Sequence, residues 1–450
     1  MPNETAAAAE RRGRLLRVLG VTFGLAVTVG NTIGAGILSA PGQVAAALPS
    51  AWWMMGAWAL GGLYALLGAN SIAELGTLMP SSGGQYVYAR RALGPYAGFV
   101  VGWSDWVSTC GAAAAVSLLI GLYAGDLFPP LAGFEKPLAG AVALAFTALQ
   151  WRGVQWGGGA QNLTSLLKAL AFVAFVAACF AWGGGTAAGG AVPPAAVPPA
   201  AFPSGAALAV SLVVALQAII YTYDGWTGVI YFSEEVRDPG RDIPRSLFAG
   251  VVLVTAIYLL FNLALLYVLP PARLAGETLA AGAAAGALFG PRGGTVLRAL
   301  VIVALLSSVN ALLLIATRVP FAMARDRLFP GWAARVREGG TPAPALLASA
   351  AVTLVFLAGD FAAVMAVLAF FFVANYAVSF VAVFVLRRRE PRAPRPWRAW
   401  GYPWTTALAL AGSLLFLAGA VAGDTAKSLL ALLVLALSYP AYRLIKNREL

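Results

Sequence analysis

Runs of about 20 apolar residues recur along the whole chain, and they constrain its fold more than any other feature. An α-helix needs about this length to cross the hydrocarbon core of a bilayer, whereas strands of membrane β-barrels show about 10 residues of alternating polarity. Only 11% of the residues are charged, against about 25% in soluble globular domains. The sequence therefore predicts an all-α membrane protein.

Short polar and Pro/Gly-rich segments divide the apolar sequence into twelve predicted transmembrane helices. With an even number of spans and both termini cytoplasmic, most of the 30 lysines and arginines fall on the inner side, as the positive-inside rule requires. The net charge of +12 then reflects membrane orientation and not binding to nucleic acid. We expect a multi-pass protein of the inner or plasma membrane, with spans near 18–48, 52–79, 95–127, 137–151, 161–182, 206–235, 245–269, 297–324, 343–358, 360–386, 404–422 and 426–444.

The stretch VTVGNTIGAGI, residues 27–37, interrupts the first predicted span. It contains Gly30, Gly34 and Gly36, and each glycine costs about 1 kcal/mol relative to alanine in a helix interior. In lipid, an unwound turn is tolerated only where it is buried in protein or lines a water-filled cavity. The interruption therefore indicates a binding site within the membrane.

A second interruption, YTYDGWTG at residues 221–228, lies in the sixth predicted span. The uncharged Gly/Ala/Pro-rich stretch 183–203 precedes that span and is typical of a linker between two groups of five spans. Interrupted spans at corresponding positions of two halves point to a transporter site built on an inverted repeat. Small residues also allow close helix packing, but the coincidence of two interruptions favours a site.

The two predicted breaks place opposite partial charges at one membrane depth. Free N–H groups at the start of the second half of the first span form a positive end that suits a carboxylate. Free carbonyls where the first half of the sixth span stops form a negative end that suits an ammonium. An α-amino acid carries both groups on one carbon, so the backbone alone favours an amino acid as ligand.

Five motifs, in this order along the chain, identify a family. They are TIGAGI, ELGTLMPSSGGQYVYARRALG, YDGWTGVIYFSEEVRDPGRDIPRS, NALLLIATRVPFAMARDRLFP and RRREPRAPRPWRAWGYPW. Together they resemble the amino acid permeases of the amino acid/polyamine/organocation superfamily, closest to prokaryotic relatives of L-type and cationic amino acid transporters. The resemblance implies a leucine-transporter-like five-plus-five inverted repeat with helices 1 and 6 broken, and alternating access. The expected divisions are a cytoplasmic tail 1–17, a first repeat 18–182, an extracytoplasmic linker 183–205, a second repeat 206–386, and helices 11 and 12 with a short tail, 387–450.

The resemblance also assigns substrate contacts. It implies that the substrate carboxylate is surrounded by Thr32, Ala35, Gly36 and Ile37, and that the substrate amine donates to the carbonyls of Tyr221, Thr222 and Asp224. Tyr221 also occupies the place of an aromatic residue that closes the external gate, with interior packing as the alternative. Ala35 stands where many relatives have serine, so the carboxylate there depends on backbone N–H groups.

Lys168 is the only lysine well inside a predicted span, and intramembrane ionisable groups are functional by default. The resemblance implies that its ammonium replaces the sodium ion of sodium-coupled relatives, touching carbonyls of the first span and a hydroxyl of the eighth, Ser307 or Ser308. Sodium dependence then becomes unexpected. The alternative is a lysine that snorkels to the inner surface.

Several carboxylates have two alternative roles each. Asp224 could meet a cationic side chain, but its position before Gly-Trp favours an N-cap of the second half-helix. Asp105 and Glu74 could relay protons or pair with neighbouring helices. An inner gate of ion pairs, or else a solvated loop, is expected from Glu234, Glu235, Arg237, Asp238, Arg241 and Arg245, with Arg90, Arg91 or Arg325 as partners.

The predicted function is sodium-independent amino acid transport, by proton-coupled symport or by exchange. A polyamine or cationic amino acid substrate is the alternative. A membrane enzyme is disfavoured because the chain has no histidine and no evident nucleophile–base pair, and an amino acid sensor because the tails are too short for a signalling domain. We expect no cofactor, no metal and no obligatory protein partner, and we expect Cys110 and Cys179 to be buried thiols.

Overall fold

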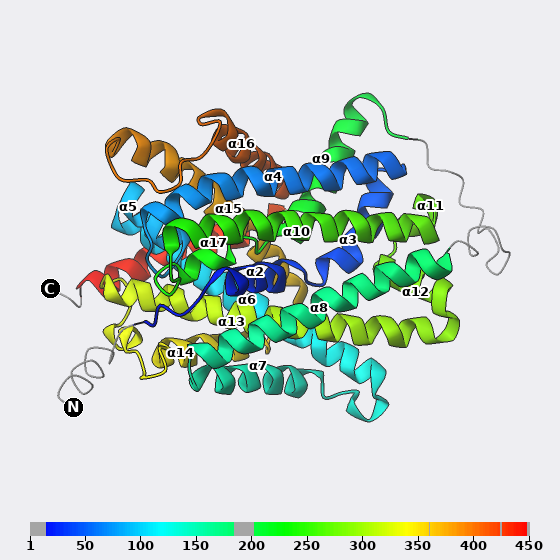
Figure 1. Ribbon diagram of the computed structural model, residues 1–450, viewed down its shortest axis with the longest axis horizontal. Coiled ribbons are helices and arrows are strands. Elements are labelled where there is room, and N and C mark those ends of the chain that lie inside the picture. The colour runs from blue at the N-terminus through cyan, green and yellow to red at the C-terminus, as the bar shows by residue number, and fades with distance from the viewer. Residues whose placement is uncertain (1–14, 184–201, 360, 424, 448–450) are drawn as a thin grey trace.

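The computed structural model describes residues 15–183, 202–359, 361–423 and 425–447. Within these ranges, the regular structure is helical apart from one isolated bridge between Leu19 and Val236. Figure 1 shows the long helices side by side in one bundle, with the first and last described segments at the same end. The expected all-α membrane protein is therefore confirmed.

Among the described residues, seven helices are long and apolar enough to cross a membrane, or eight if the bent pair α2–α3 counts as one span. Every one of the predicted spans overlaps a described helix, and the number twelve stays a prediction. The longer helices are α4 (Ala51–Leu78), α6 (Pro95–Leu127), α7 (Glu135–Trp151), α8 (Val154–Trp182), α9 (Gly205–Tyr223), α10 (Pro239–Val268), α13 (Gly293–Arg325), α14 (Ala343–Phe356), α15 (Phe361–Arg389), α16 (Trp404–Gly423) and α17 (Thr425–Asn447).

Short elements that the apolar pattern did not predict connect these helices. They are α5 (Gln85–Leu93), α11 (Pro271–Leu274), α12 (Ala280–Phe289) and the 3-10 helices η1 (Pro129–Leu131), η4 (Gly290–Arg292) and η5 (Gly331–Ala334). Their sequences are too short or too polar to read as spans. The tail 1–17 and the linker 183–205 fall mostly outside the described residues.

The first span is broken where the glycines predicted it. Helix α2 (Val21–Thr32) ends and α3 (Gly36–Ala47) begins after three intervening residues, and the two axes are bent by 50°. The last carbonyls of α2 and the first N–H groups of α3 have no partner within their own helices. The expected broken N-terminal helix is therefore confirmed, with its polar backbone groups inside the bundle.

The sixth predicted span is also irregular. Helix α9 ends at Tyr223, a turn follows, and a 3-10 helix, η3 (Gly228–Phe232), replaces the expected second α-helical half. Gly225 has φ +102°, which disfavours residues with a side chain. A Cβ there would lie 2.8 Å from the Asn31 carbonyl carbon and side-chain amide nitrogen. This glycine therefore lets the two interrupted segments approach each other.

Helix α13 lies in the middle of the bundle and packs against α2, α6, α7, α8 and α14. Most of its residues are buried, including the polar Ser307, Ser308 and Asn310. Cys110 on α6 and Cys179 on α8 are free and buried, as expected. The breaks thus sit against polar residues of the bundle interior.

Candidate functional site

The two breaks are in direct contact. The Asn31 side-chain amide donates to the Gly225 carbonyl at 3.3 Å, and a Cβ on Gly36 would lie 3.3 Å from the Thr222 Cα. The Tyr258 hydroxyl, on α10, lies 2.8 Å from the Thr32 carbonyl and 2.9 Å from the Thr222 carbonyl. One phenol from a third helix thus joins both helix ends.

The predicted carboxylate-binding groups lie at the start of α3. Ala35 is its N-cap and Gly36 its first residue, and these positions and Ile37 belong to the helical turn whose N–H groups lack an intrahelical acceptor. The Thr32 hydroxyl is buried and has no hydrogen-bond partner in the described part of the chain. The break therefore presents both backbone N–H groups and an unused hydroxyl.

The predicted amine-binding carbonyls lie at the end of α9. The Tyr221 carbonyl accepts from the Asp224 N–H at 3.1 Å, and the Thr222 carbonyl already faces Tyr258. A carbonyl oxygen has two lone pairs, and the Tyr258 hydroxyl engages one of those of Thr222. Tyr221 is half-buried, and its predicted gating role stays a prediction.

Lys168 on α8 is fully buried, and its ammonium lies against the first break. It donates to the carbonyls of Gly30 at 2.7 Å and Ile33 at 2.5 Å, and to the Ser308 hydroxyl at 3.0 Å. Ser308 in turn donates to the Gly30 carbonyl at 2.8 Å. The alternative of a snorkelling lysine is therefore wrong, and the proposed coupling role stays a prediction.

Ser307, the other serine considered for Lys168, belongs to an adjacent polar cluster. Its hydroxyl lies 2.8 Å from that of Ser165 and 3.2 Å from the Gln161 amide nitrogen. Both of these α8 side chains donate to the Ala26 carbonyl of α2. A Cβ on Gly30 would lie 2.7 Å from the hydroxyls of Ser165 and Ser307, so glycine at this position lets α2 pack on the cluster.

A small polar cavity adjoins both breaks. Asp105 on α6 accepts from the Tyr231 hydroxyl at 2.8 Å, and Asp224 accepts from the Tyr376 hydroxyl of α15 at 2.5 Å. The cavity has a volume of about 20 Å³. Its walls are completed by Asn31, Gln85, Thr109, Gly225, Thr227, Leu312, Ile315 and Phe372.

The expectation that Asp224 caps a second half-helix is wrong. Asp224 is the C-cap of α9, whereas η3 begins four residues later with Thr227 as its N-cap and no side-chain capping bond. The left-handed turn at Gly225 prevents a helix from starting directly after Asp224. Its carboxylate therefore faces Tyr376 and the cavity.

Two of the charged residues near η3 form a buried ion pair. The Arg318 guanidinium of α13 donates to both Glu235 oxygens, at 2.9 and 3.0 Å, and both side chains are at most 1% exposed. The guanidinium also lies 4.7 Å from the centre of the Phe232 ring. Leu19, just before α2, exchanges backbone hydrogen bonds with the Glu235 carbonyl and the Arg237 N–H. The loop after η3 is thus fixed to α2 and α13.

The other expected gate residues have mixed partners. Glu234 pairs with Arg325 at 2.6 Å, one of the expected combinations. Arg90 and Arg91 instead pair with Asp326 and Glu390, because α5 places them beside the ends of α13 and α15. Arg237 is exposed and takes part in none of the ion pairs between described residues. The exposed start of α10 contains Asp238, Arg241 and Arg245, and Arg241 pairs there with Asp242.

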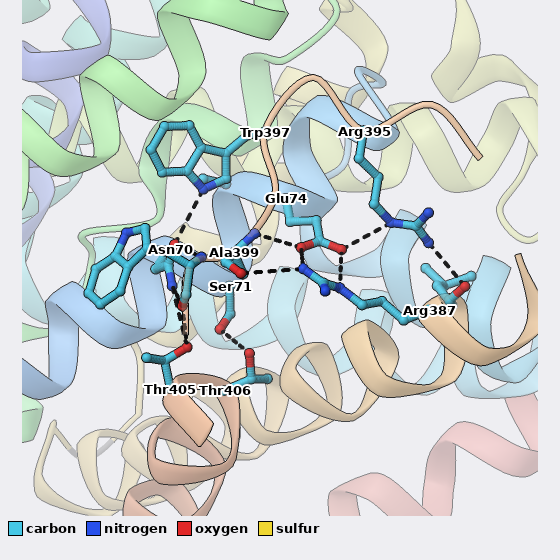
Figure 2. A network of polar contacts seen from close by, with 12 residues as sticks. Asn70, Ser71, Glu74, Arg387, Arg395, Trp397, Ala399, Thr405 and Thr406 are labelled. Atoms are coloured by element: carbon cyan, nitrogen blue, oxygen red, sulfur yellow. Dashed lines mark hydrogen bonds and ion pairs between the residues drawn. The ribbon is translucent and has the colours of Figure 1, made fainter. Parts of the chain in front are cut away.

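Glu74 on α4 binds the segment between α15 and α16, as Figure 2 shows. It accepts from the guanidinium groups of Arg387 and Arg395 and from the Ala399 N–H at 2.8 Å. One turn earlier, Asn70 accepts from the Trp400 N–H and donates to its carbonyl. Of the two roles considered for Glu74, the structure therefore shows pairing with neighbouring segments.

Glu390 lies outside the spans, at the start of the same connection. Hydrogen bonds from the Arg91 guanidinium, at 2.5 and 3.1 Å, hold the pKa of the Glu390 carboxyl below its usual value. The carboxylate is therefore ionised at neutral pH, and it ties α5 to the end of α15.

Sequence reasoning missed Asn31, Tyr258 and Arg318. Asn31 stands inside the glycine-rich motif and could have been noticed as its only amide. Arg318 is a charge inside a long apolar run, a signal of function in membranes. Tyr258 carries no such signal, because an aromatic residue in an apolar helix is ordinary.

Comparisons with known proteins identify the family of this chain. The family model described as amino acid permease matches residues 15–436. The serine/threonine exchanger SteT of Bacillus subtilis is 30% identical over 446 residues, which cover 97% of this chain and 98% of that protein. The Asc-type amino acid transporter 1 of Mus musculus is 28% identical over 403 residues, 86% of this chain and 74% of that protein. The chain belongs to the amino acid permease family of the amino acid/polyamine/organocation superfamily, and it is a multi-pass amino acid transporter and not an enzyme.

Proposed function

We propose that this protein exchanges amino acids across the inner or plasma membrane by alternating access and without sodium. The observation that carries the proposal is the Lys168 ammonium, which donates to two carbonyls of the first break and to Ser308. A fixed cation at this position supplies the charge that a bound sodium ion would otherwise supply. Binding and release of sodium are then unnecessary for ordering the break.

The proposed architecture has twelve spans, with α2–α3 and α9–η3 each forming one interrupted span. Residues 18–182 and 206–386 form two inverted repeats of five spans, 183–205 link them on the extracytoplasmic side, and 387–450 add two helices. The excess of lysine and arginine in the loops assigned to the inner side supports cytoplasmic termini. The bend of 50° between α2 and α3 supports the first interruption.

The proposed substrate site lies between the two breaks. The substrate carboxylate accepts from the N–H groups at the start of α3 and from the unused Thr32 hydroxyl. The substrate ammonium donates to the carbonyls at the end of α9. Tyr221 closes this site toward the outside, and the ion pairs of Glu234 and Glu235 close it toward the inside, while Arg237 contributes positive charge at that entrance.

Exchange is preferred to proton-coupled symport because a relative similar over almost the whole chain is named a serine/threonine exchanger. A cationic amino acid or polyamine is the second candidate substrate, favoured by the carboxylates of Asp105 and Asp224 at the cavity. The two substrate classes differ in the charge that the cavity must neutralise.

A thermal-shift screen of the purified protein tests the ligand class, because a ligand that binds the folded state raises its melting temperature. The proposal expects shifts with neutral amino acids. Shifts with agmatine or putrescine and none with neutral amino acids would select the second candidate. For coupling, an imposed pH gradient that drives uptake into liposomes without internal amino acid would replace exchange by proton symport.

A further inference from the structure

The cavity beside the breaks contains an unsatisfied hydrogen-bond donor. Gln85, at the start of α5, is 2% exposed, and its amide nitrogen has no partner among the described residues. A buried amide N–H without an acceptor is costly, and such a group in a native structure calls for an explanation. Because Gln85 lines the cavity, a bound group could supply the missing acceptor.

The same cavity offers unused acceptor capacity. One oxygen of Asp105 accepts from Tyr231 at 2.8 Å, while among the described residues the other has only a long contact of 3.5 Å from the Thr109 hydroxyl. A carboxylate can accept about four hydrogen bonds. The lining of the cavity therefore includes both a donor, on Gln85, and an acceptor, on Asp105.

Only some chemical groups can form hydrogen bonds with both Gln85 and Asp105. A hydroxyl accepts from an amide and donates to a carboxylate at the same time. An ammonium or guanidinium group only donates and leaves the Gln85 amide unsatisfied, and a methyl group satisfies neither. The pair of Gln85 and Asp105 therefore matches a hydroxyl group.

The size of the cavity supports the same choice. Its volume of about 20 Å³ is room for roughly one water molecule, the size of a hydroxyl. Leu312, Ile315 and Phe372 bound it on the apolar side.

We infer that the cavity binds the side-chain hydroxyl of a small amino acid, such as serine or threonine, with Gln85 donating to it and Asp105 accepting from it. The inference rests on the proposed function, because the head group is placed at the breaks. Asn31 and Gly225 belong to the breaks and also line the cavity. A side chain leaving an amino acid held at the breaks therefore reaches the cavity directly.

The test compares threonine with valine, which has nearly the same shape without the hydroxyl. Each amino acid is homoexchanged in proteoliposomes containing wild-type protein, Gln85→Leu or Asp105→Asn, and kcat/KM is measured. The wild type is expected to prefer threonine by at least about 100-fold. Each variant should reduce this ratio about tenfold or more, whereas the exposed control Gln155→Leu keeps the wild-type ratio.

A wild type that exchanges valine as well as threonine overturns the inference, and so do variants that lower both substrates equally. Thermal shifts by threonine and valine give a second readout that needs no flux. A selective shift by threonine, reduced in both variants, supports the inference even if no exchange is found, and then the proposed function alone fails. Without selectivity in either assay, the inference is wrong.

Discussion

Replacing Glu235 by glutamine tests the buried ion pair most sharply, because it leaves the Arg318 guanidinium buried without an opposing charge. Both side chains are at most 1% exposed, and the two hydrogen bonds measure 2.9 and 3.0 Å. Breaking a pair of this kind costs about 3–5 kcal/mol. Glutamine keeps one acceptor oxygen, so we expect a loss near the lower end, about 3 kcal/mol.

The neighbouring Glu234 provides a matched control. It pairs with Arg325, but these side chains are 25% and 48% exposed, and pairs of that type contribute about 0–1 kcal/mol. In a thermal-shift assay on purified protein, Glu235→Gln should lower the melting temperature by about 3 °C, and Glu234→Gln by about 1 °C or less.

The double variant Glu235→Leu with Arg318→Met completes the test. It removes both charges, and replacement of a buried pair by apolar residues is often neutral or stabilising. The single variants Glu235→Leu and Arg318→Met each leave one buried charge unpaired and should lower the melting temperature. We expect the double variant to regain most of that decrease. Equal shifts for Glu235→Gln and Glu234→Gln, or a double variant as unstable as the sum of the singles, would refute this reasoning.

Three further changes probe the breaks. Lys168→Met should reduce exchange at least tenfold in folded protein, because two carbonyls of the first break lose their donor and the break loses its link to Ser308; normal exchange by this variant would disprove the coupling role. Gly225→Ala should lower the melting temperature, since the new methyl group meets Asn31 in a left-handed turn, and an unchanged melting temperature would argue against contact between the breaks. Tyr258→Phe leaves two carbonyls without their shared donor, at about 1–3 kcal/mol, so exchange should fall while the exposed control Tyr267→Phe remains active; equal exchange rates for these two variants would contradict a role for Tyr258.

Much of the fold could be predicted because the bilayer imposes strong rules. Apolar length alone located each long helix, and the glycines at 30, 34 and 36 located the break after Thr32. The short helices α5, α11 and α12 lie between spans, where no hydrophobic rule applies. The 3-10 conformation of η3 could not be predicted from the sequence either, because it depends on the turn at Gly225 and its contact with Asn31.

The candidate site was predictable where one residue violated the apolar pattern. Lys168 stood out for that reason, but only the structure separates Ser308, which contacts it, from Ser307, which lies in the neighbouring cluster. Pairings between distant segments, such as Glu235 with Arg318, require three-dimensional packing. The unsatisfied amide of Gln85 is likewise visible only when its surroundings are known.

Countertransport in proteoliposomes, with sodium present and with sodium absent, tests most directly whether this protein exchanges amino acids without sodium. Labelled serine is supplied outside, with or without unlabelled serine inside, in potassium and in sodium buffers. We predict that internal serine strongly stimulates uptake and that both buffers give the same rate. Uptake that requires sodium, or that internal amino acid does not stimulate, would contradict the account.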